Sequence, residues 1–503
     1  MNQRKVGIFI SYINIVFHAL VGFIYVPLLL HFIGKSEYGL YQLVGSLIAY
    51  FSIMDFGLTA AVVRFYTNYK AENNKVGMEN ILAISLRAYT VISVVLFGIG
   101  CVCYFNLNNI FAESMSLMEI ASAKQLFWLL LFNIVLTVST MIFRAVINAH
   151  EKYLFLKGLE TVQVVLQPIV VLVVLQQHPY ALSVALVQTV LNALLISARI
   201  FYCFSKLNIT IKYHYWDKDL FRDFKKLALS VFAVTLIDQV FFKTNQVILG
   251  IVSGTTAVAV YSVSALIYMN YMALSIAVSG VYLPHITSMV ANGEPIKKLS
   301  DLFIQIGRWQ YYLLALVASG FIIFGQRFIR IWAGNGFEDA YWITLLIIIP
   351  FTVDLIQNIG LSIMQAQNKY DFRAKVYFCM GIFNLLLAIP LAKEYGGIGC
   401  AFATGLAMFI GNGLIMNWYY AKVTGLDIKE FWWQIGKISL GVTALTLVGY
   451  LLNDFVSSDS ITLYCIKILL YTIVYGAVMY AWFTNDSEKD KVNGIIKRLR
   501  IAL

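Results

Sequence analysis

Residues 149–155 read Ala-His-Glu-Lys-Tyr-Leu-Phe and residues 366–372 read Ala-Gln-Asn-Lys-Tyr-Asp-Phe, so Ala, Lys, Tyr and Phe recur in register. Further landmarks recur in the same order: Gly34 with Tyr41 returns as Gly254 with Tyr261, Arg87 as Arg308, and Asn192-Ala-Leu-Leu as Asn412-Gly-Leu-Ile. Each match alone is weak, but together, at an offset of about 220 residues, they favour a duplicated half. A duplicated, mostly apolar chain is typical of a transporter whose pathway lies between its halves.

The composition points to a membrane. The chain has 503 residues, of which 60% are hydrophobic and 13% are charged, more apolar surface than a soluble protein could cover. Apolar runs of about 20 residues, enough to cross a bilayer, recur along the whole chain and are predicted to be helices. The short alternating segments of a membrane barrel do not occur. The predicted fold is an all-α polytopic membrane protein with about 14 transmembrane helices, in two parallel six-helix repeats plus two extra C-terminal helices.

The apolar runs define the organisation of the chain. The predicted spans are 8–30, 38–64, 82–105, 123–148, 154–176, 180–204, 228–250, 256–290, 309–327, 340–366, 374–392, 396–420, 434–453 and 461–483. The predicted domains are an N-terminal six-helix bundle (1–205), a cytoplasmic linker (206–227), a C-terminal six-helix bundle (228–421), two additional transmembrane helices (422–483) and a basic cytoplasmic tail (484–503). The first span lacks a small-residue cleavage site, so we interpret it as a retained helix.

The net charge of +11 is explained by membrane topology. Lysines and arginines gather in alternate loops, including Lys206 through Lys226 and Lys489 through Arg500, whereas the intervening loops carry few. The positive-inside rule therefore predicts that both termini lie in the cytoplasm. A nucleic-acid partner is not needed to explain the basic balance.

Polar side chains inside the predicted spans are the candidate functional residues, and many share one face of their helix. The candidates are His18, Asp55, Arg64, Arg144, Asp238, Lys243, Asn245, Tyr268, Tyr271, Asp354 and Asn358. A charge at mid-bilayer costs about 2.5–3.5 kcal/mol on insertion scales, so the ionisable residues must face protein or water. Hydrogen bonding between packed helices is the alternative, above all for serines and threonines. For the ionisable residues we expect a water-filled cavity.

Several kinds of chemistry have no motif in this sequence. Gly34-Lys35-Ser36 mimics the end of an ATP-binding loop, but position 29 is leucine where the first glycine is required. The histidines show no zinc spacing, and the six cysteines form no C-x-x-C pair. A membrane glycosyltransferase would need a large catalytic loop, and the longest predicted loop has only about 22 residues. We therefore expect neither an enzyme nor a bound cofactor or metal.

The N-terminal stretch from Pro27 to Tyr41, followed by Asp55-Phe-Gly57 and Arg64, resembles bacterial polysaccharide-export flippases. These flippases serve O-antigen, capsule or teichoic acid assembly and belong to the multidrug/oligosaccharidyl-lipid/polysaccharide exporter superfamily. The resemblance implies a V-shaped pair of six-helix bundles in the bacterial inner (plasma) membrane. It also implies that a polyprenyl-pyrophosphate-linked oligosaccharide moves to the outer leaflet by alternating access, without ATP hydrolysis. The last two spans would form a groove for the lipid tail.

The resemblance also suggests partners and residue roles. Partners would be the lipid-linked oligosaccharide, membrane lipids, and a polysaccharide polymerase with its glycosyltransferases. Arg64 and Arg144 near the cytoplasmic mouth, with Lys243 deeper, could hold the pyrophosphate. Acidic residues outnumber these bases, so either the acids pair with the bases or some bind a coupling H⁺ or Na⁺. Asp55 suits the first role, and Asp238 and Asp354 are candidates for the second. An ion-coupled multidrug extrusion carrier is the alternative function.

Overall fold

The computed structural model describes residues 3–55, 57–216, 222, 235–236, 239–455, 460–486, 488–490 and 493–494. The side chains of residues 3–16, 18 and 454–455 are outside this description. Of the predicted linker, residues 206–216 and 222 are therefore described, and of the predicted basic tail only part.

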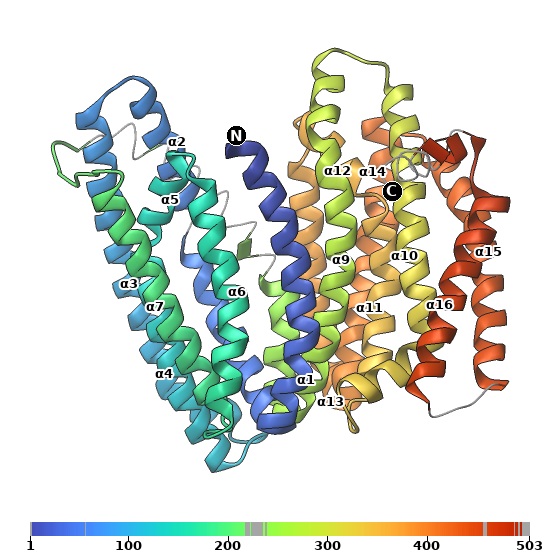
Figure 1. The fold of residues 1–503 in the computed structure, drawn as a ribbon, viewed down its shortest axis with the longest axis horizontal. Coiled ribbons are helices and arrows are strands. Elements are labelled where there is room, and N and C mark those ends of the chain that lie inside the picture. The colour runs from blue at the N-terminus through green and yellow to red at the C-terminus, as the bar shows by residue number, and fades with distance from the viewer. Residues whose placement is uncertain are drawn as a thin grey trace. The chain divides into compact units, whose positions relative to one another are not determined.

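The elements are helices, labelled in Figure 1. They are α1 (Gln3–Phe51), η1 (Ser52–Asp55), α2 (Leu58–Ala71), α3 (Lys75–Phe111), α4 (Leu117–Ser139), α5 (Met141–Ala149), α6 (Tyr153–Leu175), α7 (Ala181–Ser205), α9 (Gly254–Ala291), α10 (Ile296–Trp332), α11 (Asp339–Leu355), α12 (Asn358–Ala366), α13 (Asp371–Met408), η2 (Phe409–Ile415), α14 (Met416–Tyr419), η3 (Tyr420–Thr424), α15 (Ile428–Phe455), α16 (Ile461–Val478) and η4 (Met479–Phe483). Residues 239–252 are also helical.

The predicted membrane fold is confirmed. Among the described residues, 10 helices are long and apolar enough to cross a bilayer, or 11 if the bent pair α11 and α12 forms one span. Two of the ten, Ala19–Ala71 and Asp371–Thr424, have 53 and 54 residues, more than twice the length of one crossing. Each contains a glycine with non-helical backbone angles, Gly34 or Gly396, at which two helices meet. The predicted span 228–250 is described only in part.

Three predicted spans are interrupted rather than continuous. The span 38–64 changes to a 3₁₀ turn at Ser52–Asp55 and restarts at Leu58 after Gly57, whose φ is 67°. The span 123–148 breaks at Thr140, and the span 340–366 bends by 42° between α11 and α12. The spacing of apolar residues does not reveal such breaks, because polar residues at them, such as Asp55, Thr140 and Gln357, are equally compatible with a continuous helix that has a polar face. Interrupted membrane helices expose backbone groups that only protein or water can satisfy.

The internal repeat is visible in matching local geometry. Phe155 stacks on Tyr202 with ring centroids 4.0 Å apart, and Phe372 stacks on Tyr419 at the same 4.0 Å. The short helices α5 and α12 have 9 residues each, and each is followed by a residue with φ of 56°, Glu151 and Asn368. Pairs of features at one offset show that the two halves of the chain share a helical plan.

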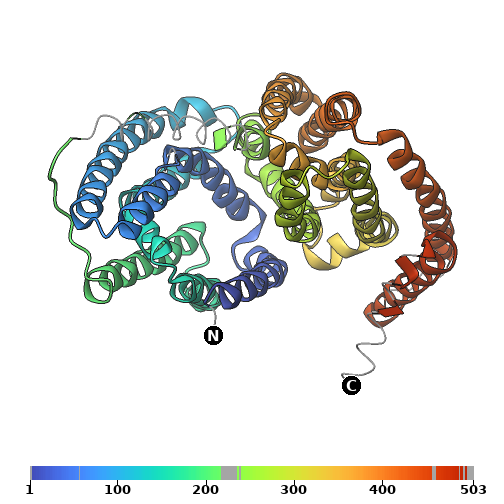
Figure 2. The same cartoon turned by 90° about the horizontal axis from the view of Figure 1, so that it is seen from above.

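Contacts divide the chain into two compact units, which differ from the predicted domain boundaries. Unit 1 comprises residues 1–266 and 385–400, and unit 2 comprises residues 267–384 and 401–503. In unit 1, α1 packs along α6 and α4, and α4 packs against α3 and α7 (Figure 1). In unit 2, α10 contacts α11, α12, α15 and α16, and Figure 2 shows α15 and α16 at one edge of that unit. The predicted boundaries describe the sequence repeat and stay a prediction.

The two repeats meet within unit 1, along a seam between the second half of α1 and residues 239–266. Gly39 lies so close to the start of α9 that a Cβ atom placed on it would stand 1.9 Å from the carbonyl oxygen of Thr255. Further along, the Ser46 hydroxyl donates to the Gln246 side chain, and the hydroxyls of Tyr50 and Thr244 lie 2.5 Å apart. Backbone contact and buried hydrogen bonds together hold this seam shut in the present conformation.

One end of the seam is fastened by a carboxylate. The Glu119 side chain accepts hydrogen bonds from the hydroxyls of Ser36 at 2.8 Å and Thr255 at 2.9 Å, and from the Ser116 backbone N–H at 3.0 Å. Beside it, the Ser114 hydroxyl donates to the Gly250 carbonyl at 2.7 Å. We call the set Ser36, Glu119 and Thr255 the clasp, because it ties α1 and the first turn of α4 to the start of α9. Hydrogen bonds to a charged acceptor are stronger than neutral ones.

The seam gives a testable contrast between two glycines on α1. Gly39→Ala is expected to destabilise this conformation by about 1–3 kcal/mol, because the added methyl group meets the Thr255 backbone and cannot be accommodated by a side-chain movement. Gly45→Ala is the matched control, since a Cβ there meets nothing within 4 Å and alanine favours a helix by about 0.5–1 kcal/mol. Thermal melting of the purified proteins in detergent measures both. Equal melting temperatures for the two variants would contradict the close approach at Gly39.

Candidate functional site

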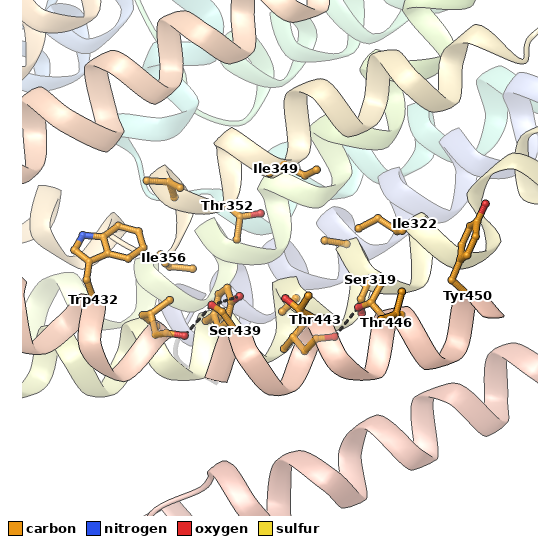
Figure 3. Close-up of a pocket in the computed structure, with 17 residues that line it drawn as sticks. Ser319, Ile322, Ile349, Thr352, Ile356, Trp432, Ser439, Thr443, Thr446 and Tyr450 are labelled. Atoms are coloured by element: carbon orange, nitrogen blue, oxygen red, sulfur yellow. Dashed lines mark hydrogen bonds between the residues drawn. The ribbon is translucent and has the colours of Figure 1, made fainter. Parts of the chain in front are cut away.

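A groove of about 550 Å³ lies in unit 2 between α10, α11 and α15 (Figure 3). Trp432 and Tyr450 mark its two ends along α15, and the facing side is lined by Ile349 and Thr352 of α11 and by Ile356, directly after that helix. The full lining is Tyr311, Ala315, Ala318, Ser319, Ile322, Ile349, Thr352, Val353, Ile356, Trp432, Ile435, Ser439, Val442, Thr443, Thr446, Leu447 and Tyr450. The groove follows α15 from Trp432 to Tyr450.

The hydroxyl groups of the groove are largely engaged with the protein. Tyr311 and Ser439 share a hydrogen bond of 2.6 Å, and Ser439 also donates to the Ile435 carbonyl. Thr446 donates to the Val442 carbonyl and Thr352 to the Ile348 carbonyl. A hydroxyl whose donor is satisfied by its own helix presents mainly carbon to its surroundings. The groove is therefore apolar in character despite its polar residue names, and suits a lipid chain better than a sugar.

A buried ion pair lies directly beyond one end of the groove. Arg308 precedes the groove residue Tyr311 by one helical turn, and its guanidinium binds Glu488 through two bonds of 2.7 Å each. Glu488 is 0% exposed and Arg308 is 5% exposed. Gln434 of α15 and the Phe483 carbonyl accept further bonds from the same guanidinium, each at 2.8 Å. This network, which we call the C-terminal latch, attaches α15 and the segment after α16 to α10.

Glu488 is a buried acidic residue within the segment that the sequence predicts to be a basic cytoplasmic tail. That predicted tail begins at residue 484. In the described part of the tail, Glu488 is fully buried and holds Arg308. Sequence reasoning missed Arg308 as an anchor because an arginine near a predicted helix end is most simply explained by topology. Its partner lies 180 positions away in the chain.

A second polar cluster in unit 2 joins α9 to α11 and α12. The Tyr271 hydroxyl lies 2.6 Å from that of Thr352, and Ser275 accepts a bond of 2.8 Å from the Asn358 amide. Tyr268 packs edge-on against Phe351. Tyr268 and Tyr271 are each only 3% exposed. In this conformation the predicted cavity residues Tyr268, Tyr271 and Asn358 connect packed helices, which is the alternative role that the sequence left open.

The predicted acidic residues differ in their partners. Asp354 feels the positive charge of Arg373, whose Nη1 atom is buried and has no hydrogen-bond partner in the described part of the chain. Asp55 sits at the break between α1 and α2 and accepts bonds from the hydroxyls of Thr59 at 2.9 Å and Tyr89 at 3.0 Å. The described partners of Asp55 are thus hydroxyls, and its pairing with a base stays a prediction. Asp238 lies outside the described residues, as does the side chain of His18.

The predicted basic residues of unit 1 also differ in their contacts. Arg144 binds Glu160 at 2.9 Å, whereas the exposed Arg64 lies over the Phe65 ring at 5.8 Å. Lys243 is half-buried on the helix of residues 239–252, next to the seam. Asn245, from the same helix, is 1% exposed and donates to the Tyr261 hydroxyl at 2.8 Å. Of the three bases proposed for the pyrophosphate, Arg144 is the one with a described carboxylate partner.

A duplicated bundle of membrane-spanning helices, with an apolar groove along one side of a unit, defines a fold of membrane transporters. Comparisons with known proteins agree. Residues 5–290 match the family described as "Polysaccharide biosynthesis protein". The chain therefore belongs to this family, within the superfamily that the N-terminal motif resembles.

The chain is also similar in sequence to two curated proteins. It is 23% identical over 436 residues to the "Uncharacterized membrane protein EpsK" of Bacillus subtilis (strain 168), covering 84% of each chain. It is also 23% identical over 184 residues to the "Putative O-antigen transporter" of Escherichia coli (strain K12), covering 34% of this chain and 43% of that protein.

The fold is similar to that of two groups of solved transporters. The "Lipid II flippase MurJ, inward closed conformation" matches with a TM-score of 0.73 at 18% identity, covering 94% of this chain and 99% of that chain. An inward-facing multidrug resistance MATE family transporter of the MOP superfamily matches with a TM-score of 0.62 at 12% identity, covering 83% and 96%. At these identities the likeness shows the fold, which is that of a multi-pass membrane transporter.

The C-terminal latch makes a prediction about stability. Glu488→Gln is expected to lower the free energy of unfolding by about 3–5 kcal/mol, because it leaves the Arg308 charge buried without its counter-ion. The double variant Arg308→Gln/Glu488→Gln is expected to lose less than the sum of the single losses, since the residues act as one unit. Denaturation of the purified protein in detergent measures these differences.

The exposed pair Glu294–Lys298, at 2.8 Å, supplies the matched control on the same helix region. Glu294→Gln should change stability by less than about 1 kcal/mol, because water screens an exposed ion pair. A loss for Glu488→Gln no larger than for Glu294→Gln would show that the latch does not anchor the C-terminal segment.

Proposed function

We propose that this protein is a flippase that translocates a polyprenyl-pyrophosphate-linked oligosaccharide from the cytoplasmic to the outer leaflet for surface polysaccharide biosynthesis. The groove of unit 2 is the observation that carries the proposal. A substrate with a hydrocarbon tail needs an apolar groove, whereas a drug molecule without such a tail does not. A lipid-linked sugar combines a hydrocarbon tail with a charged, hydroxyl-rich head. The groove suits the tail, and family membership supports the substrate class.

Alternating access without ATP hydrolysis is the proposed mechanism. The seam of unit 1 supports it, since the second half of α1 meets residues 239–266 of the other repeat through hydrogen bonds that can be broken and reformed. Closing this end while the other is open, and then the reverse, would expose the head to one side at a time. Polar contacts of this kind suit a seam that opens, because their groups can bond to water when they separate.

The residue roles expected from the sequence complete the proposal. Arg64, Arg144 and Lys243 would contact the pyrophosphate, and His18, Asn245, Tyr268, Tyr271 and Asn358 would contact the sugars in a conformation that exposes them. Asp238 and Asp354 would bind the coupling H⁺ or Na⁺, and at Asp354 that ion would compete with Arg373. We place the protein in the bacterial inner membrane with both termini in the cytoplasm. A polymerase and glycosyltransferases would be its working partners.

An ion-coupled multidrug extrusion carrier is the second candidate function. The similarity to a MATE family transporter and the acidic residues at helix breaks favour it. The two candidates differ in their need for the groove, since a drug molecule has no polyprenyl tail to accommodate. Loss of surface polysaccharide without drug sensitivity in a deletion strain would exclude the extruder.

Filling the groove tests the proposed substrate. Ala318→Trp places an indole among the lining residues and is expected to reduce surface polysaccharide at least about tenfold, because the volume left for a hydrocarbon chain falls while the protein still inserts. Polysaccharide on intact cells and the amount of protein in the membrane are measured together. The same variant is expected to leave drug resistance unchanged.

Leu440→Trp is the matched control, because Leu440 lies on α15, which forms another wall of the groove, but is 75% exposed and does not line the groove. It should support normal export. Normal export by Ala318→Trp, at a normal protein level, would contradict the proposal that the groove holds the lipid tail.

A further inference from the structure

Four charged residues gather where α5, α6 and α7 meet in unit 1. Glu160 of α6 accepts a bond of 2.9 Å from Arg144 of α5 and one of 2.7 Å from Lys157 of its own helix. Arg199 of α7 lies near enough for its charge to act on both Arg144 and Glu160. We call these residues the basic cluster. Three cations share one carboxylate, so the cluster carries an excess of two positive charges.

The hydrogen-bond donors of the basic cluster are only partly paired within the described residues. The Nε atom of Arg199 is buried and has no hydrogen-bond partner in the part of the chain that the structure describes. Among the described residues, Arg144 donates to Glu160 through one of its nitrogens, and its other guanidinium donors can serve a ligand. The side chains of Arg144 and Lys157 are 51% and 33% exposed, so an anion can reach them. Uncompensated positive charge beside a hydrocarbon layer is costly and calls for an anion.

The second repeat shows that the fold does not need these charges. The stacked pairs Phe155–Tyr202 and Phe372–Tyr419 fix the correspondence between the repeats in this region. By that correspondence Leu361, Tyr377 and Met416 take the places of Arg144, Glu160 and Arg199. The same helices therefore pack in the second repeat with apolar or neutral side chains there. A charged cluster that packing does not require is better explained by binding.

We infer that the basic cluster binds a phosphate-bearing anion and that Glu160 is a built-in counter-ion, which the phosphate displaces from Arg144 and Lys157. Each guanidinium can bind phosphate oxygens through two parallel hydrogen bonds, and Lys157 adds a point charge. When the ligand leaves, Glu160 pairs again with Arg144 and Lys157, so these two cations share a counter-ion in the empty site. Competition of this kind keeps affinity moderate, as a site that must release its ligand requires.

The identity of the anion rests on the proposed function. If the protein moves a polyprenyl-pyrophosphate-linked sugar, the ligand is its diphosphate, which would add Lys157 and Arg199 to the residues expected from the sequence. The phosphate of an anionic membrane lipid has the same chemistry, and an experiment can separate the two sources.

The test uses the purified full chain and inorganic pyrophosphate as the probe, with affinity measured by isothermal titration calorimetry at low salt. Glu160→Gln is expected to tighten binding about tenfold, because it removes the competing carboxylate at nearly constant shape. Arg199→Gln and Lys157→Gln are each expected to weaken binding about tenfold. Arg87→Gln is the matched control, since Arg87 is a cation of the same unit that stacks on Tyr213 at 4.0 Å, away from the cluster.

The outcomes separate the possibilities. Unchanged or weaker binding in Glu160→Gln, or an equal loss in Arg87→Gln, would overturn the inference. In nanodiscs, a wild-type affinity that falls when phosphatidylglycerol replaces phosphatidylcholine assigns the site to a lipid headgroup, and an unchanged affinity assigns it to the transported head. A protein that binds pyrophosphate as described but fails to export polysaccharide would contradict the proposed function alone. A protein that exports polysaccharide but binds no pyrophosphate would contradict the basic cluster alone.

Discussion

The clasp around Glu119 is the interaction on which the account of transport depends. A charged sugar head cannot cross hydrocarbon, so it needs a hydrated route that is never open to both sides at once. In this structure Glu119 collects donors from Ser36 and Thr255, which belong to different repeats. Gly39 allows the backbones to meet beside it. The seam that follows combines hydrogen bonds with apolar packing such as that of Leu43 against Gly250, and water can replace its polar contacts when it opens.

The two proposed binding surfaces match the two parts of a lipid-linked sugar. The groove in unit 2 turns its hydroxyls toward its own helices, and it presents carbon to a hydrocarbon chain. The basic cluster in unit 1 does the opposite, since it keeps positive charge in excess of its one carboxylate. The C-terminal latch explains how α15 can form a wall of the groove although it lies outside the repeat: Arg308 and Glu488 attach it to α10. The groove thus depends on hydroxyls that bond within the protein, and the basic cluster depends on excess positive charge.

Much of the fold follows from the sequence, because hydrophobic runs and repeated motifs are properties of the chain itself. Gly34 and Gly254, paired in the sequence, both adopt positive φ at helix junctions. The breaks at Ser52–Asp55 and Thr140 could not be predicted, because they depend on contacts such as the bond from Thr59 to Asp55. Arg199 was missed because a single arginine near a helix end is explained by topology. The partners of Arg308 and Glu119 are distant in sequence, and tertiary packing alone brings them together.

The most direct test of alternating access is a reversible lock on the seam. With the native cysteines replaced, Ser36→Cys and Thr255→Cys would place two thiols where the hydroxyls now lie 3.0 Å apart. Translocation of a fluorescent polyprenyl-pyrophosphate sugar is then followed in proteoliposomes before and after oxidation. We expect the disulfide to stop translocation and a reductant to restore it. In each single-cysteine variant, oxidation should leave translocation unchanged. Undiminished translocation with the disulfide fully formed would show that the seam does not open during transport.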